Sequence, residues 1–245
     1  LETARGGILR EGLGFDQCDV AIVTNIGEGD HLGLSGIDTL DQLAAVKRVI
    51  VEAVAINGSA VLNADDPYTV AMAPYCRGTT IFFSRNPDNP VIQAHRKRDG
   101  RAVIVRNDCI YTAEGDQEFR LCALRNVPLT HGGLIGFQVE NVIAAVAAAW
   151  HLGIPAQTIL TGLESYVSGG QAAPARFNVM ESNGATVIID YGHNSSALFA
   201  LVEAVQRIPH ERRLIVYTAA GDRRDCDIIR QAEILANAFD HIVIY

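Results

Sequence analysis

Three short apolar runs separated by helix-like stretches constrain the fold of this chain more than any other feature of its sequence. The runs are continuous instead of alternating, and they span residues 20–24, 59–63 and 80–83. Continuous apolar strands are typical of a parallel sheet that is covered on both faces. Between the first two runs, apolar residues recur at helical spacing, at Leu40, Leu43, Ile50 and Val54. The pattern predicts a strand–helix–strand unit within an α/β fold.

The middle of the chain follows a different pattern. A second helix is predicted to begin at Pro67, after Asp66, which can cap it. Residues 91–127 show period-two alternation with turn signals such as Asp99-Gly100 and Asn107-Asp108. This alternating pattern, interrupted by turn signals, predicts a run of antiparallel hairpins.

The second half of the chain predicts another α/β unit. An alanine-rich helix is expected over residues 138–151, and the Gly-, Ala- and Pro-containing stretch 169–175 is predicted to be a linker. Beyond the linker we expect three strands and two helices, with strands at 186–189, 214–217 and 241–245 and helices at 196–207 and 227–238. The prediction is therefore two α/β domains, residues 1–170 and 171–245.

The charge balance narrows the class of partner. Lys and Arg number 20 against 28 Asp and Glu, a net charge of −8. Nucleic acid and anionic membranes both attract basic surfaces, so neither is expected as a partner. The sequence shows no apolar run long enough to span a bilayer and no secretory signal pattern, and five cysteines without a CxxC pair fit reduced thiols. A cytoplasmic protein is therefore expected.

Polar residues that follow the predicted strands are the candidates for chemistry, because ligands bind beyond the carboxyl ends of strands in open α/β sheets. Asp30 and His31 follow the first strand on a glycine-rich loop, where they could ligate a divalent metal or simply shape the loop. Asp65 and Asp66 follow the second strand, and a helix cap explains only one of them. In the second half, Asp190 to Asn194 and Gly221 to Asp225 each lie between a strand and a helix.

Lys47 lies in the middle of the apolar stripe of the first predicted helix. A lysine there either extends its ammonium group to the rim of the stripe or serves a function, because burying an unpaired charge is costly. A functional lysine at this position would have to lose its charge or meet an anion.

The ordered motifs of this chain resemble the superfamily of ATP-dependent Mur ligases and folylpolyglutamate synthetases. The motifs that carry the resemblance are Glu2-Thr3, Thr24-Asn25-Ile26, Asp30-His31-Leu32, Lys47, Asn63-Ala64-Asp65-Asp66-Pro67, Gly136 with Asn141, Ala144-Ala145, Ala175-Arg176 and Asp190-Tyr191-Gly192-His193-Asn194. They cover nearly the whole chain. Residues 1–10 and 27–33 look most like the branch that elongates a poly-aspartate backbone carrying arginine on its β-carboxylates.

The resemblance implies a central ATPase domain with a mostly parallel sheet and an antiparallel hairpin section. Part of a Rossmann-like carboxy-terminal domain would follow it. The family's glycine-rich phosphate loop is not present in the sequence. We therefore expect the chain to be an internal piece of a longer homo-oligomeric enzyme that supplies this P-loop part and an ATP-grasp half. The expected cofactors are ATP and Mg²⁺, and the expected substrates are the aspartate/arginine polymer and free arginine.

The resemblance also implies roles for individual residues. Magnesium would be held by Glu2, His31 and Lys47, with Lys47 carbamylated into an anionic ligand. Lys47 and His31 would also act in catalysis, together with His193. Nucleotide contacts would come from Asn141, which matches an adenine contact, and from Arg176, Asp190 and Asn194.

Three alternatives remain open from the sequence. The chain could belong to a peptidoglycan-precursor or folate-tail ligase instead of the poly-aspartate branch. It could be a metallohydrolase that uses Glu2, Asp30, His31 and Asp66, although no second histidine at ligand spacing accompanies them. It could also be a nucleotide-binding module without catalytic activity.

A first prediction concerns the chain by itself. Without the phosphate-binding loop, the 245-residue chain is expected to release no phosphate from ATP above background when supplied with Mg²⁺, arginine and the aspartate polymer. A coupled ADP assay measures this. Turnover comparable to that of a complete ligase would contradict the assignment of the missing loop to another segment.

Overall fold

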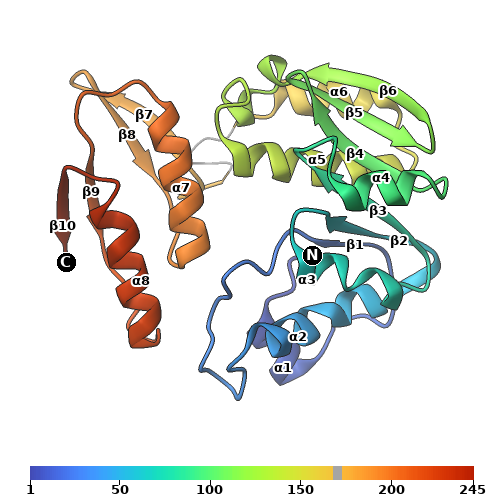
Figure 1. Ribbon diagram of the computed structural model, residues 1–245, viewed down its shortest axis with the longest axis horizontal. Coiled ribbons are helices and arrows are strands. Elements are labelled where there is room, and N and C mark those ends of the chain that lie inside the picture. Colours follow the sequence, from blue (N-terminus) through green and yellow to red (C-terminus); the bar gives the residue numbers. More distant parts are fainter. Residues whose placement is uncertain (168–172) are drawn as a thin grey trace.

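The computed structural model describes residues 1–167 and 173–245 (Figure 1). The amino-terminal part, residues 1–167, contains a six-stranded sheet, and the carboxy-terminal part, residues 173–245, contains two two-stranded sheets. The boundary predicted at 170/171, within the linker 169–175, falls in the stretch 168–172, outside the described residues. The α/β class and the mostly parallel sheet predicted from the sequence are confirmed.

The large sheet follows the order of the chain. Its strands are β1 (Cys18–Val23), β2 (Val54–Asn63), β3 (Thr79–Ser84), β4 (Arg101–Arg106), β5 (Cys109–Glu114) and β6 (Gln117–Ala123). Strands β1 to β4 are parallel, whereas β5 and β6 are added as antiparallel hairpins. The sheet is therefore parallel where the apolar runs are continuous and antiparallel where the sequence alternates.

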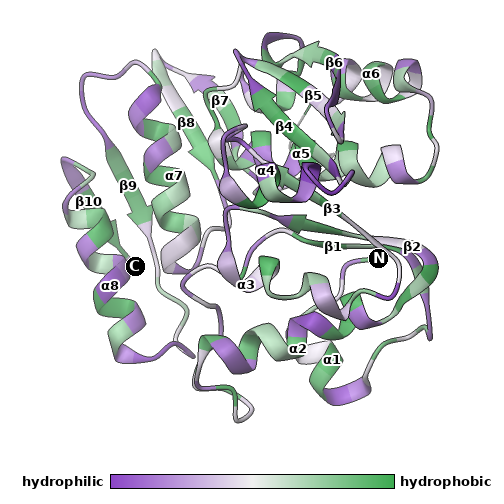
Figure 2. Cartoon of the chain, turned by 45° about the vertical axis from the view of Figure 1, so that its right-hand side comes forward, coloured by the Kyte–Doolittle hydropathy of each residue, from purple (hydrophilic) through white to green (hydrophobic). Residues whose placement is uncertain are grey.

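Helices cover both faces of this sheet and bury the apolar runs. On one face lie α2 (Leu40–Glu52), α3 (Pro67–Val70) and α4 (Pro90–Arg96), and on the other lie α5 (Gly136–His151) and α6 (Ala156–Ser165). Because successive strand residues point to opposite faces, Phe82 packs on the α2 side while Phe83 packs on the α5 side. Figure 2 shows the strands between the helices as mostly hydrophobic.

Two sequence predictions need correction. Residues 91–96 do not belong to a hairpin but to α4, because Asn89 caps the helix by accepting from the amides of Val91 and Ile92 and Pro90 begins its first turn. The hairpins start only at Arg101. Val54 is not on the helix but is the first residue of β2, since α2 ends at Glu52.

Among the described residues, the sequence analysis also missed α1 (Arg5–Glu11), α6, β7 (Asn178–Ser182) and three 3₁₀ turns. In the carboxy-terminal part, β7 pairs antiparallel with β8 (Ala185–Ile189), and β9 (Leu214–Tyr217) pairs parallel with β10 (His241–Ile244). Helices α7 (Ser195–Arg207) and α8 (Asp225–Ala236) pack on each other through Leu198, Ile234 and Leu235. Among the described residues, no helix combines the length and apolarity needed to cross a membrane.

We expect substitution of a buried and of an exposed phenylalanine to lower the stability of the chain by very different amounts. Phe83 is fully buried, whereas the side chain of Phe119 on β6 is 60% exposed. Phe83→Ala is expected to lower the free energy of unfolding by about 3–5 kcal/mol, because it removes buried apolar surface and leaves a cavity. Phe119→Ala should change it by less than about 1 kcal/mol. Urea denaturation of both variants measures the difference, and equal losses would contradict this core.

Candidate functional site

The loop that follows β1 is held in place by one carboxylate. Asp66 Oδ2 accepts hydrogen bonds from the amides of Ile26 at 2.6 Å and Gly27 at 3.1 Å. Its Oδ1 accepts from the amides of Tyr68 and Thr69, which caps α3. Asp66 thus ties the loop after β1 to the helix after β2.

The neighbouring Asp65 has a separate structural task. Its carboxylate accepts from Ser84 Oγ at the end of β3 and from Asn89 Nδ2, the cap of α4. The two adjacent carboxylates therefore face different partners and do not form an acid–base pair. This explains why both are present after the second strand.

The loop held by Asp66 presents Asp30 and His31 at the edge of the sheet. The backbone of His31 has a φ of 57°, in the left-handed region that is rare for residues other than glycine. Arg5 holds this turn by donating from Nη1 to the carbonyl oxygens of His31 at 2.8 Å and Leu34 at 3.1 Å. Strained backbone of this kind concentrates at functional sites, where the surroundings stabilise it.

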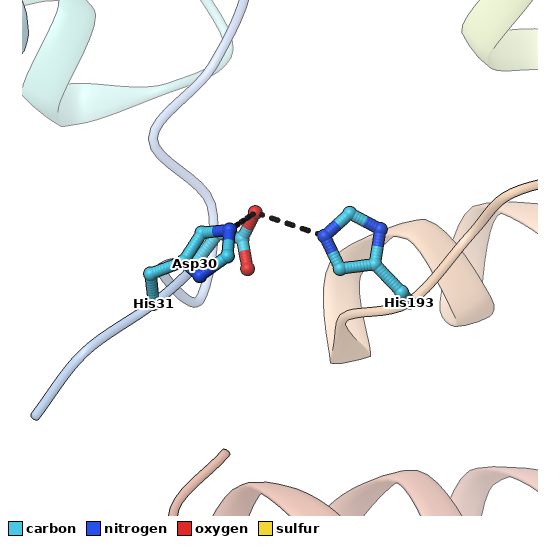
Figure 3. A group of neighbouring side chains, drawn as sticks. All are labelled: Asp30, His31 and His193. Atoms are coloured by element: carbon cyan, nitrogen blue, oxygen red, sulfur yellow. Dashed lines mark ion pairs between the residues drawn. The ribbon is translucent and has the colours of Figure 1, made fainter. Parts of the chain in front are cut away.

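His193 from the carboxy-terminal part completes a cluster with Asp30 and His31 (Figure 3). Asp30 Oδ2 lies 3.5 Å from His31 Nε2 and 3.3 Å from His193 Nε2. One carboxylate from the loop after β1 is therefore shared between imidazoles of both parts of the chain. A small cavity of about 50 Å³ lies beside them and is also lined by Asn194.

Arg223, between β9 and α8, reaches the same cluster. Its side chain is only 3% exposed, and its Nη2 lies 3.1 Å from Asp30 Oδ1. Its Nη1 lies 2.8 Å from His31 Nδ1 and 2.7 Å from Asp222 Oδ1, while Nη2 is 3.4 Å from His31 Nε2. The buried guanidinium is thus neutralised by one carboxylate from each part of the chain.

These surroundings keep His31 neutral. Burial is the main cause that lowers the pKa of His31, and the nearby Arg223 and Arg5 lower it further. Asp30 and Asp222 act in the opposite direction without reversing the shift. A neutral imidazole can offer one ring nitrogen as an acceptor or as a metal ligand.

Lys47 lies half-buried on α2 and lines a different cavity. This cavity of about 800 Å³ runs along β1, and Glu2, Thr24 and Asn25 also line it. Within residues 1–167 and 173–245, Lys47 has no ion-pair or hydrogen-bond partner. Burial is the largest cause that lowers the pKa of Lys47, although the charges of Asp30 and Asp66 oppose that shift. The amine is therefore easier to deprotonate than an ordinary lysine.

The predicted magnesium ligands line two cavities. Glu2 is exposed and lines the cavity with Lys47, whereas His31 lines the smaller cavity together with Asp30. Among the described histidines, cysteines and carboxylates, the group whose ligand atoms converge contains Asp30, His31 and His193 but not Glu2. The assignment of Glu2, His31 and Lys47 to one cation stays a prediction.

Of the predicted nucleotide residues, Asn141 lies on a helix, and Arg176, Asp190 and Asn194 lie in loops of the carboxy-terminal part. Asn141 is on the second turn of α5, where its Nδ2 donates to Gln138 Oε1 at 3.2 Å. Asp190 accepts from the amides of Phe177 and Gly192, and Asn194 caps α7 by accepting from the amide of Ala197. Arg176 lies over the ring of Tyr191. Asp190 and Asn194 thus shape the loop that carries His193.

Sequence reasoning missed Arg223 and the role of Asp30 as the centre of the cluster. Residues 221–225 were noted as a strand-to-helix turn, which was the available signal. The contact between His31 and Arg223, however, joins residues 192 positions apart in the chain. Only the arrangement of the amino-terminal and carboxy-terminal parts brings them together.

Two family models match the chain. Residues 1–149 match the Mur ligase middle domain, and residues 175–245 match the Mur ligase, glutamate ligase domain. Cyanophycin synthetase of Synechocystis sp. is 41% identical over 244 residues, which is all of this chain and 28% of that protein. The chain therefore spans well under half the length of this relative.

Solved structures share the fold at low sequence identity. MurF from Acinetobacter baumannii superimposes with a TM-score of 0.65 at 21% identity, covering 93% of this chain and 47% of that one. MurF ligase from Thermotoga maritima in complex with ADP gives a TM-score of 0.63 at 22% identity, covering 94% and 49%. These likenesses support the arrangement of the strands and helices.

The position of Lys47 generates a stability prediction. Lys47→Met is expected to raise the free energy of unfolding at neutral pH by on the order of 1 kcal/mol, because it replaces a desolvated, unpaired ammonium with an apolar side chain. The pKa of Lys47 is lower in the folded than in the unfolded chain. Below the pKa of Lys47 in the folded chain, the gain in the free energy of unfolding is therefore complete. It decreases as the pH rises above that pKa and disappears near the pKa of an ordinary lysine.

Denaturation curves at several pH values, in buffer free of carbon dioxide, measure this gain. The exposed Lys97 provides the control, since Lys97→Met should leave stability nearly unchanged at every pH. A loss of stability in Lys47→Met at neutral pH would show that the ammonium has a favourable partner.

Proposed function

Because this chain belongs to the Mur ligase family, we propose that it is part of an ATP-dependent ligase that joins arginine to the β-carboxylates of a poly-aspartate backbone. The observation that carries the proposal is the similarity to cyanophycin synthetase over the whole chain at 41% identity. ADP in the related Thermotoga maritima MurF supports the use of ATP. The cluster of Asp30, His31 and His193 lies where ligands bind to open α/β sheets.

The proposed reaction forms an amide bond in two steps. A side-chain carboxylate of the polymer attacks the γ-phosphorus of ATP, which gives an acyl phosphate and ADP. The α-amine of arginine then attacks the acyl carbon, and phosphate leaves as the amine loses its proton. Such chemistry depends on positioning and on charge stabilisation more than on covalent help from side chains.

The residues proposed to contact the nucleotide come from both parts of the chain. We assign the adenine contact to Asn141 on α5 and further contacts to Arg176, Asp190 and Asn194. The hydrogen bonds of Asp190 and Asn194 to backbone amides support this role, because they fix the loop before α7. A neutral His31 and the nearby His193 are suited to exchange protons with the reacting amine.

Magnesium is proposed to bind at Glu2, His31 and Lys47. Bound there, it would offset the negative charge of the transferred phosphoryl group. Magnesium prefers oxygen ligands, so the ammonium form of Lys47 does not fit this set, whereas its carbamate does. The lowered pKa of Lys47 supports carbamylation, because the neutral amine attacks carbon dioxide and releases one proton.

The family models over residues 1–149 and 175–245 support two domains. We place their boundary at 170/171 and propose that a hinge joins them. Movement at this hinge would bring Arg176 and Asp190 onto the nucleotide. The P-loop and ATP-grasp parts would come from other segments of the same homo-oligomeric protein. The coverage of 28% of the Synechocystis relative leaves room for such segments.

The full-length protein tests this proposal. We expect ATP-dependent incorporation of arginine into an aspartate polymer at least tenfold above that of diaminopimelate or glutamate, measured by product mass together with ADP release. Diaminopimelate is included because a diaminopimelate ligase of Synechococcus elongatus is 28% identical over 95% of the chain. Preference for either competitor would reassign the substrate, and ATP binding without any product would favour a silent module.

The role of Lys47 is tested in the same assay. Lys47→Arg keeps the positive charge but forms no stable carbamate, so kcat is expected to fall about 100-fold or more. Lys97→Arg should retain nearly full activity. Full activity of Lys47→Arg would exclude the carbamate from the mechanism.

A further inference from the structure

We propose that Asp30, His31 and His193 form a binding site for a first-row transition-metal ion that joins the two parts of the chain. The site shares His31 with the proposed magnesium set, but it takes its other ligands from Asp30 and from the carboxy-terminal part. Both sets would draw on His31, but the test of this site is separate from that of the ligase proposal, because metal binding here requires no nucleotide, polymer or arginine.

The geometry suits coordination. Ligand atoms around a tetrahedral ion with bonds near 2.0–2.1 Å lie about 3.3 Å apart. Asp30 Oδ2 already lies at 3.5 Å from His31 Nε2 and 3.3 Å from His193 Nε2. The three ligand atoms all lie within 4.8 Å of one another, so the two imidazoles need to approach by at most about 1.5 Å. Figure 3 shows both rings directed at the carboxylate.

The donor set selects the class of ion. Two imidazole nitrogens and one carboxylate oxygen suit Zn²⁺, Co²⁺ or Mn²⁺, whereas Mg²⁺ prefers an all-oxygen shell. A cavity of about 50 Å³, lined by Asp30 and His31, lies beside the cluster and has room for water. All three residues are also partly exposed, so solvent can supply the remaining ligand.

Arg223 and a metal ion exclude each other at His31. A guanidinium only donates hydrogen bonds, so the shorter contact, from Nη1 to Nδ1 at 2.8 Å, requires the lone pair of His31 to be on Nδ1. The proton of the neutral ring is then on Nε2, which has no lone pair for a metal. Coordination through Nε2 moves that proton to Nδ1, where it faces the N–H of Arg223.

Asp222 is placed to complete the metal-bound arrangement. Its Oδ2 lies 3.7 Å from His31 Nδ1, so it can accept the Nδ1 proton once Arg223 has moved away. Metal-bound histidines commonly donate their second nitrogen to a carboxylate in this way. In the structure, therefore, the ion pair between Arg223 and Asp30 joins the two parts. In the metal-bound form, the metal ion would join them in place of this ion pair.

The proposal predicts opposite effects of two substitutions on metal affinity. His193→Gln removes a ligand and is expected to weaken Mn²⁺ binding at least tenfold, and Arg223→Met removes the competitor and should strengthen it at least fivefold. The matched controls are His210→Gln, in an exposed histidine outside the cluster, and Arg224→Met, in a neighbour that pairs with Asp227. Both controls should change affinity less than twofold.

Titration of the 245-residue chain with Mn²⁺, followed by electron paramagnetic resonance, measures these affinities, and visible absorption of Co²⁺ reports the coordination geometry. Thermal unfolding of each variant checks that it is folded. Affinities are compared only between variants whose melting curves match that of the unchanged chain. Arg223→Lys is a second variant that keeps the positive charge and weakens the contact to His31, so it should also strengthen Mn²⁺ binding.

Three results would overturn the proposal. Binding that is lost in His31→Gln but unchanged in His193→Gln would place the ion in the magnesium set and leave the ligase proposal intact. Binding removed by alkylation of the free cysteines would place it on thiols. Equal affinities in Arg223→Met and Arg224→Met would show that Arg223 does not compete. A failure of arginine incorporation, in contrast, would affect only the proposed function.

Discussion

The hydrogen bonds of the Asp66 carboxylate are the interaction on which the rest of the site depends. Both of its oxygens accept from backbone amides, on the loop after β1 and on the first turn of α3. Hydrogen bonds to a charged acceptor are stronger than neutral ones, and a buried amide left without a partner is costly. The position of Asp30 and His31 thus follows from a residue that takes no part in their chemistry.

The sequence predicted the sheet well because its signals are local. Continuous apolar runs predicted β1 to β3, and alternation predicted β4 to β6, with bounds correct to within a few residues. The exception is the start of β2, which lies at Val54, earlier than predicted. The error at residues 91–96 has a local cause as well. The cap at Asn89 and the proline at position 90 outweigh a weak alternation, and both were visible in the sequence. Short elements such as α1 and β7 depend on packing, which local patterns do not contain.

The site was less predictable because its contacts are long-range. Strand ends drew attention to Asp30, His31 and residues 190–194, and the structure brings Asp30, His31 and His193 together. The partners of these residues depend on how the carboxy-terminal part lies against the sheet. The nearly fully buried Arg223 faces Asp30 from the loop after β1, and no spacing rule connects residues so far apart in sequence. The unpaired state of Lys47 likewise follows from three-dimensional surroundings.

Asp30 links the local chemistry to the arrangement of the whole chain. Its two oxygens face Arg223 and His193, both from the carboxy-terminal part, and also His31 from its own loop. A buried guanidinium remains favourable only while carboxylates face it, so separating the two parts would expose Arg223 and leave Asp30 without those partners. Ligand binding at Asp30 and the contact between the two parts use the same carboxylate. Any ligand that changes the charge at Asp30 must therefore also change the free energy with which the two parts associate.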